Sequence, residues 1–427
     1  MANIPLTPGP PFQFRLAGPV ILCLLAFTGV FARGLANGAY GALLAWALID
    51  LAFRRRAGLP GLGQIPPHYW AGAGAFLAVY ALAGALGGDP AASFRKVGLL
   101  VYLLCALPAV YLAVSVLPPL IPQVLPWFYG AGLMAAGLMT FFQAGCEFAC
   151  VRAKASLGVL ELAAVLGQLV PLMVGSLALS RPRPRKAAFF LASLALAAVA
   201  LVLNCSRIAL ICVPVLGLVM LVAFRRELGA RLALALILVA ALGAAMAFRD
   251  GTLIERFLDM TELSGTNPAN EERLMRWRQG LSVFREHPLL GAGPGAVPNV
   301  PAEILPGEFQ GRPRAEYYHS HQVFITVLAE AGILGLAAFL ALHLLPLLYI
   351  APGFRSRRPW TRLWAWAALT VFLQLVLNGM VDNVFTLKPL MYLYWTATGT
   401  AVYLVGREPG APAALMSRQP AISPATL

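Results

Sequence analysis

Long apolar segments constrain this chain more than any other feature. A helix needs about 20 apolar residues to cross a bilayer, and we find twelve segments close to that length. They are residues 15–33, 35–53, 67–88, 97–117, 120–143, 158–179, 187–204, 207–224, 232–248, 321–350, 363–380 and 388–405. Only 12% of the residues are charged, about half the share of a soluble domain. The sequence therefore predicts an all-α polytopic membrane protein with about twelve transmembrane helices.

Clusters of Arg and Lys between these segments predict how the chain is oriented. The four clusters lie at residues 54–56, 181–186, 225–231 and 355–362, and each follows an even-numbered span. Short basic loops stay in the cytoplasm, so both termini are predicted to be cytoplasmic, and every loop from an odd to an even span is predicted to lie outside. Because these clusters account for most of the net charge of +14, no nucleic-acid partner is expected.

This topology divides the chain into four parts. Residues 1–248 hold spans one to nine, 249–320 form one large loop on the outer side, 321–405 hold the last three spans, and 406–427 are a cytoplasmic tail. The large loop carries nearly balanced numbers of Arg and of Asp or Glu, which suits a segment that is translocated and folds by itself.

The six cysteines lie in or beside the apolar segments. Free cysteine is among the most buried residue types, so inert buried thiols are expected. Cys146 and Cys150 fall in a predicted outer loop, where a disulfide bridge between them is the alternative.

A group of cations falls on the predicted outer face, where the charge bias of the loops does not explain it. Arg207 follows Ser206 between spans seven and eight, and Arg152 and Lys154 lie in the third outer loop. A guanidinium near hydrocarbon is costly unless it is paired, and its planar fork of donors fits phosphate oxygens. These residues therefore indicate an anion clamp; snorkelling to lipid headgroups is the alternative explanation.

The large loop contains a second basic segment, ERLMRWRQG, and then HPLLGAGPGA. On a helix, Arg273 and Trp277 share one face, with Arg276 beside them, although a helix resting on the membrane surface would show the same pattern. In the second segment, Gly293 and Gly295 allow backbone N–H groups to approach an anion. Both segments are therefore candidates for binding a phosphate-bearing substrate.

Two histidines, His319 and His321, stand at the start of the tenth span. On a helix they point about 200° apart, so that only one faces a given site. A metal site needs three or four ligands, which the nearby residues do not supply, so no metal or cofactor is expected. An imidazole can take up and release a proton near neutral pH, which favours proton transfer; a histidine that caps the span is the structural alternative.

Asp382, in the last outer loop, is the carboxylate that we connect with this histidine pair. We predict that it assists the site by orienting His321 or by binding the acceptor. The alternative is that it serves as an N-cap for span twelve, because Asp is a preferred residue at that position.

Three of these motifs, in this order, resemble the bacterial O-antigen ligase family and, more broadly, the O-antigen ligase/polymerase superfamily. The first is Ser206–Arg207, and the second is RLMRW followed by HPLLGAGPG. The third is HQVFITVLAEAGILG (321–335), which is similar to the family pattern H-N-x-x-L-x-x-L-x-E-x-G-x-x-G, with Gln322 and Ile325 in place of Asn and Leu. The segment that begins at Arg152 matches the superfamily's R-x-x-G-x-x-x-N-P-N only loosely.

The resemblance implies a fold, an activity and a set of site residues. It implies a GT-C-like glycosyltransferase of the bacterial inner membrane whose helices surround a cavity open to the periplasm. The donor would be an O-antigen glycan on undecaprenyl diphosphate and the acceptor a sugar hydroxyl of lipid A–core, so that transfer completes lipopolysaccharide. Arg207 and Arg273 would bind the diphosphate, and His321 would be the catalytic histidine. Transfer is expected to invert the anomeric centre without a metal, with membrane lipids as further partners.

Other functions fit parts of the same pattern. An O-antigen polymerase or a protein O-oligosaccharyltransferase would use the same donor with a different acceptor. A lipid-glycan flippase or transporter would place its binding groups near the middle of the membrane. Here the polar residues gather on one side of the predicted spans, with Glu161 and Glu330 as the exceptions. We therefore favour chemistry at the outer surface.

Overall fold

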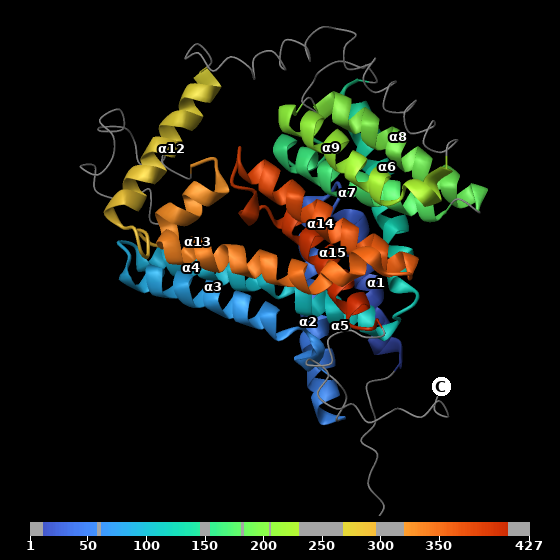
Figure 1. The fold of residues 1–427 in the computed structure, drawn as a ribbon, viewed down its shortest axis with the longest axis horizontal. Coiled ribbons are helices and arrows are strands. Elements are labelled where there is room, and N and C mark those ends of the chain that lie inside the picture. The colour runs from blue at the N-terminus through green and yellow to red at the C-terminus, as the bar shows by residue number, and fades with distance from the viewer. Residues whose placement is uncertain are drawn as a thin grey trace, which may run out of the picture.

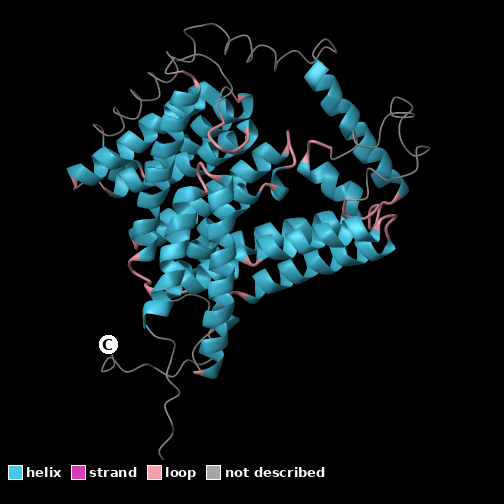
Figure 2. Ribbon diagram, turned by 180° about the vertical axis from the view of Figure 1, so that it is seen from behind, coloured by secondary structure: helices cyan, strands magenta, loops and turns pink. Residues whose placement is uncertain are grey.

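Helices make up the regular structure of this protein. The computed structural model describes residues 12–57, 61–145, 154–180, 183–204, 206–229, 268–295 and 320–408. Within these ranges every regular element is a helix (Figure 1, Figure 2), apart from an isolated bridge between Ala32 and Ser156. The predicted all-α class is therefore confirmed.

The helices follow one another along the described residues, most of them with short connections. The longer ones are α1 (Phe12–Thr28), α2 (Arg33–Arg56), α3 (Pro67–Leu86), α4 (Pro90–Leu104), α5 (Ala106–Val116), α6 (Ile121–Gln143), α7 (Val159–Leu179), α8 (Pro184–Asn204), α9 (Arg207–Ala223), α12 (Pro268–Glu286), α13 (Val323–Ile350), α14 (Pro359–Gly379) and α15 (Lys388–Val405). The short 3-10 helices η1 (Leu62–Gln64), η6 (Ala351–Arg355) and η7 (Val384–Thr386) lie in the connections.

Among the described residues, 8 helices are long and apolar enough to cross a membrane, with α4 and α5 taken together and α13 taken with η6. The apolar parts of α1 and α9 are shorter. Each predicted span has a helical counterpart except 232–248, which lies outside the described residues. The structure therefore supports a multi-pass membrane protein, while the number of twelve spans stays a prediction.

The predicted fourth span, 97–117, is not a single straight helix. It consists of α4 and α5, which meet at Cys105. Pro108 has no N–H with which to bond the carbonyl of Leu104, four residues earlier. That carbonyl accepts a hydrogen bond from the Tyr69 hydroxyl instead, at 2.5 Å. A proline inside the segment and a tyrosine from α3 thus explain the interruption.

α7 is the most enclosed of the candidate spans, because 89% of its most apolar 18-residue stretch is buried within the protein. It packs against α8, α9 and α14, and these helices form the larger group in Figure 1. At Gly167 a Cβ would lie 2.1 Å from the side chain of Gln374, so the small residue leaves room on α7 for the Gln374 amide from α14. This packing holds α7, which begins at Val159, two residues before Glu161, in a fixed place.

A second group, made of α3, α4 and α13, extends away from that core, with α12 at its far end (Figure 1). α13 packs along α3, and α12 packs along α13. The predicted tenth span, 321–350, is interrupted, because Gly332 has φ 64° and ψ −162° inside α13. The break separates a short first part of α13 from a longer second part, and the candidate site lies at the beginning of the first.

Candidate functional site

His321 and Asp382 meet at the start of α13, although they are far apart in sequence. The Nδ1 atom of His321 lies 3.2 Å from Oδ1 of Asp382, and the two side chains are 32% and 15% exposed. The same oxygen accepts the backbone N–H of Asn383 at 2.8 Å. An ionised carboxylate can only accept hydrogen bonds, so Nδ1 is the donor and Nε2 is the nitrogen that can take up a proton. The pair therefore has the geometry of an oriented general base.

The alternative explanation for Asp382, an N-cap for the last span, is wrong. α15 begins at Lys388, and the residue at its N-cap position is Leu387. Asp382 instead follows α14 and precedes η7, with its carboxylate against the imidazole. The contact that an orienting role requires is present, and its effect on catalysis stays a prediction.

His321 stands just before α13 and is not its cap. Its φ of 48° places it in the left-handed region, which is uncommon for a residue other than glycine. The N-cap is Gln322, whose side chain accepts the N–H of Ile325 and whose carbonyl accepts the Thr326 hydroxyl at 2.8 Å. The interpretation of the histidine as a helix cap is therefore wrong. The capping amide also explains how glutamine can replace the asparagine of the family pattern.

The RLMRW segment is helical, as predicted, and lies within α12. Arg273 and Trp277 are one turn apart, Arg276 is beside them, and all three are half-buried. α12 packs against α13. At this contact a Cβ on Gly280 would lie 2.3 Å from Oγ of Ser320, so only a glycine lets α12 lie against the residue before the predicted catalytic histidine. The fold thus brings the arginine-bearing helix beside the histidine segment.

Some predicted site residues are not described by the structure. His319, Arg152 and the pair Cys146–Cys150 lie outside the described residues, so the predictions about them stay predictions. Arg207 is the first residue of α9, in agreement with the predicted span 207–224, but its side chain also lies outside the description.

The glycine-rich segment binds α13 through its backbone. The N–H of Ala292 donates to the carbonyl of Ala329 at 2.8 Å, and the N–H of Gly293 donates to the carbonyl of Glu330 at 3.1 Å. The N–H of Gly295 donates to Oε1 of the Glu330 carboxylate at 3.0 Å. These N–H groups are engaged within the protein, which leaves the predicted contact of this segment with a substrate anion without support.

Two left-handed glycines make this docking sterically feasible. Gly332, at the break in α13, would place a Cβ 2.3 Å from the carbonyl carbon of Leu289. Gly291, with φ 65°, would place one 2.4 Å from the backbone nitrogen of Ala331. A side chain at either position meets both backbone strain and occupied space. The HPLLGAGPG and AEAGILG segments, which looked like separate motifs, are therefore two halves of one packed unit.

Glu330, one of the two exceptions to the one-sided distribution of polar residues, is paired with Lys96. It is 3% exposed, and its Oε1 forms an ion pair with Nζ of Lys96 from α4. A charge inside a membrane span is costly unless it is compensated, so the pair explains why both residues are tolerated there. Lys96 is one residue that the motifs missed. Its signal was a lysine at the predicted outer end of a span, where the charge bias of the loops does not require one.

We expect Glu330→Ala to lower the free energy of unfolding by about 3–5 kcal/mol, because the change leaves the Lys96 ammonium without its partner. Lys96→Met should also destabilise, while the double variant Lys96→Met/Glu330→Ala should lose less than the sum of the two single losses. Chemical unfolding in detergent measures this, with the exposed neighbour Arg95→Ala as the matched control. Strictly additive losses would contradict the coupling.

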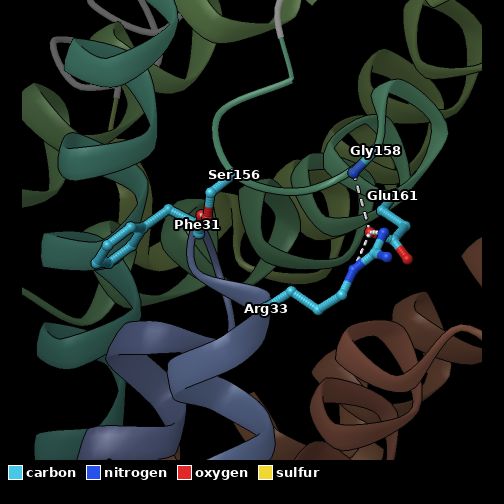
Figure 3. A network of polar contacts seen from close by, with 5 residues as sticks. All are labelled: Phe31, Arg33, Ser156, Gly158 and Glu161. Carbon is cyan, nitrogen blue, oxygen red and sulfur yellow. Dashed lines mark hydrogen bonds and ion pairs between the residues drawn. The ribbon is translucent and has the colours of Figure 1, made fainter.

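A second buried carboxylate, Glu161, holds Arg33, the first residue of α2. Its Oε2 accepts the N–H of Gly158 at 3.0 Å and Nε of Arg33 at 3.1 Å, and it also contacts Nη2 of that arginine (Figure 3). Glu161 thereby caps α7, while the Arg33 side chain stays 50% exposed. The carboxylate therefore fixes one edge of a guanidinium whose other side remains accessible.

The loop that contains Lys154 is fastened on both sides. Oε1 of Gln143 accepts the N–H groups of Lys154 and Ala155 at 3.2 and 3.0 Å. The N–H of Ser156 donates to the carbonyl of Phe31 at 3.2 Å (Figure 3). The Lys154 side chain is exposed, so this loop presents a cation at a defined place beside α2 and α7.

A further cation, Lys388, is the first residue of α15. Its Nζ lies 5.5 Å from the centre of the Tyr102 ring, and Tyr392, one turn later, donates to Oδ1 of Asn37 at 2.9 Å. Asn37 and Arg33 lie one turn apart and so share a face of α2. These contacts join the start of α15 to α4 and to α2, the helices next to Lys388 and Arg33, two cations that no motif includes.

A comparison with known protein families gives a match, which covers the Ser206–Arg207, RLMRW and HQVFITVLAEAGILG motifs. The family model described as O-antigen ligase matches residues 192–340. The match covers about a third of the chain. The predicted resemblance to the O-antigen ligase/polymerase superfamily is therefore confirmed for these residues, and enzymes of this family are glycosyltransferase-like and act on O-antigen. Among curated proteins, none matches the chain.

The O-antigen ligase match contains the three motifs but not the whole site. It runs from α8 into the second part of α13 and includes Arg207, Arg273 and His321. Asp382 lies beyond it and reaches the histidine only through the folded contact described above. The family range and the candidate site thus overlap without coinciding.

Proposed function

We propose that this protein is an O-antigen ligase. It transfers a glycan from undecaprenyl diphosphate to a sugar hydroxyl of lipid A–core at the periplasmic face of the bacterial inner membrane. The observation that carries the proposal is the contact between His321 and Asp382, beside α12 and within reach of the family motifs. A histidine oriented by a carboxylate is suited to taking the proton from an acceptor hydroxyl.

The proposed reaction is a single displacement at the anomeric carbon of the donor. The acceptor oxygen forms the new glycosidic bond while the bond between the anomeric carbon and the diphosphate oxygen breaks, and the configuration inverts. Nε2 of His321 accepts the proton of the acceptor hydroxyl, and the lipid diphosphate leaves with both electrons of the broken bond. All bonds, protons and electrons of this displacement are accounted for without a redox step or a cofactor.

The leaving diphosphate gains negative charge in the transition state, and preorganised cations stabilise such charge best. We assign this role to Arg273 on α12 and Arg207 at the start of α9, with Arg276 as a neighbouring donor. Arg152 and Lys154, from the third outer loop, add positive potential. Trp277 belongs to the same helix, and its indole N–H is buried without a partner among the described residues.

The cations that the motifs missed extend this positive region. Arg33 is held by Glu161, and Lys388 stands over Tyr102. Both are at the first residue of their helices, on the side where the proposed orientation places the periplasm. We propose that they attract the anionic groups of the two lipid-linked substrates, and that membrane lipids complete the surroundings of the site.

Reconstitution tests the function and separates the alternatives. Purified protein is incubated with a labelled polyprenyl-diphosphate glycan and rough lipopolysaccharide, with and without EDTA. Label on lipid A–core is the expected product, and activity should survive EDTA. Label on a longer polyprenyl glycan would indicate a polymerase, and label on an added acceptor protein an oligosaccharyltransferase. Movement of intact donor across a vesicle would indicate a flippase. Loss of activity in EDTA that a divalent ion restores would contradict the metal-free displacement.

Asp382→Asn should slow transfer by about 10²–10⁴-fold, the range that general acid–base catalysis contributes. The amide keeps the size of the side chain but no longer fixes Nδ1 of His321 as the donor. We expect kcat to fall more than KM rises, with an altered pH–rate profile and an unchanged melting temperature. A variant with wild-type kcat would remove Asp382 from the site, and equal losses of stability and activity would indicate a structural role.

A further inference from the structure

A pocket opens at the opposite ends of the helices from the candidate site. It has a volume of about 550 Å³ and lies between the α5–α6 connection, the start of α14 and the end of α15. These are the ends at which the basic clusters of the sequence gather, beside residues 355–362. Nothing in the proposed transfer reaction uses this pocket.

Two guanidinium groups line the pocket. Nη1 of Arg358 donates to the carbonyl of Arg407 at 3.1 Å, and the Arg407 guanidinium stands 5.2 Å from the centre of the Tyr403 ring. One carboxylate, Glu408, lies 3.9 Å from Nε of Arg358, and its other oxygen accepts the Ser356 hydroxyl at 2.7 Å. Arg407 has no ion-pair partner among the described residues. The lining therefore carries a net positive charge.

The Tyr403 ring is part of the pocket lining and is only 1% exposed. Because burial fixes this ring, its cation–π contact holds the Arg407 guanidinium at the pocket. A ligand with acceptor oxygens would bind both guanidinium groups together.

Apart from Gln123 and Thr361, the rest of the wall is apolar. Pro118, Pro119, Pro122 and Pro359 have no backbone N–H to offer a polar ligand. Trp360 also lines the pocket, and tryptophan is enriched where headgroups meet hydrocarbon. Two cations together with an apolar wall that is poor in N–H groups fit a molecule with an anionic head and a hydrocarbon tail.

We propose that this pocket binds the phosphate headgroup of an anionic membrane phospholipid, with Arg358 and Arg407 on the phosphate and the acyl chain along the prolines. Basic pockets between transmembrane helices on the cytoplasmic side bind such headgroups. The proposed orientation of the chain decides only which leaflet supplies the lipid. The site stands whether or not the protein is a ligase, because its residues are separate from His321 and the arginines of α12.

Native mass spectrometry of the detergent-purified protein tests the site. The protein is titrated with phosphatidylglycerol and cardiolipin, and with phosphatidylcholine as the zwitterionic comparison. We expect the anionic lipids to bind more tightly, and Arg358→Ala/Arg407→Ala to weaken their binding at least tenfold. Arg357→Ala is the matched control, because this exposed neighbour carries the same charge but does not line the pocket. Equal losses in the control and the double variant would mean general electrostatics and overturn the site.

A second measurement does not depend on the arginines. Brominated phosphatidylglycerol should quench tryptophan fluorescence in the wild type, and Trp360→Phe should remove a saturable part of that quenching. Unchanged quenching in Trp360→Phe would contradict the placement of the lipid. Displacement of the lipid by millimolar inorganic phosphate or pyrophosphate would show that the pocket takes a soluble anion, which would also overturn the lipid assignment.

Discussion

His321→Asn should strongly slow glycan transfer while leaving donor binding and folding intact. Loss of the proton acceptor should cost about 10²–10⁴-fold in kcat, the usual contribution of general acid–base catalysis. Asparagine is the informative replacement, because His321 has a φ of 48° and asparagine tolerates that left-handed region better than alanine does. Single-turnover transfer with saturating donor measures the effect, and donor binding is followed separately.

The control for this histidine is His68→Asn. His68 is exposed at the start of α3 and belongs to no motif, so transfer should be unchanged. His319→Ala should be milder than the change at His321, since the contact with Asp382 belongs to the latter. An inactive His319→Ala beside an active His321→Asn would reverse the assignment of the catalytic histidine.

Replacing either Arg207 or Arg273 with alanine should remove roughly 1.5–3 kcal/mol of charge-assisted hydrogen bonding to the diphosphate. That energy corresponds to about 10–150-fold in kcat/KM for the donor, and the loss grows if charge on the diphosphate increases in the transition state. Lysine should rescue poorly, because an ammonium lacks the planar fork that binds two oxygens at once. Steady-state kinetics with varied donor measure the change.

Arg285→Ala is the matched control for the arginine on α12. It lies on the same helix as Arg273, carries the same charge and is exposed, so its removal should leave kcat/KM close to the wild type. If the three alanine variants lost activity equally, the arginines would be acting through general surface charge. Full rescue by lysine at position 273 would contradict bidentate binding of the diphosphate.

The positions of the helices could be predicted from local sequence. A span is recognised because its side chains must be apolar enough to face lipid and because its backbone hydrogen bonds form within the helix itself. For this reason the predicted ranges 35–53, 120–143 and 158–179 correspond closely to α2, α6 and α7. The breaks were harder to predict. The one in α13 depends on Gly332, whose left-handed backbone is matched to a loop more than thirty residues earlier.

The candidate site was predicted in part. Motifs identified Arg207, Arg273 and His321, since each stands in a pattern of neighbours along the chain. The partner of the histidine, Asp382, was named from its place in an outer loop, but two roles were open. Only the fold showed that its carboxylate reaches the imidazole and that α15 begins later, at Lys388.

The sequence by itself determined what depends on neighbouring residues: the apolar spans, the basic loops and the order of the motifs. The tertiary structure decided which buried charges compensate one another, as Lys96 does for Glu330 and Arg33 for Glu161. It also decided that the backbone N–H of Gly295 binds Glu330. These contacts join residues far apart in the chain, and their partners are chosen by how the helices pack. Hydropathy and local spacing carry no information about that choice, because a buried charge can be compensated by any segment that the fold brings to it.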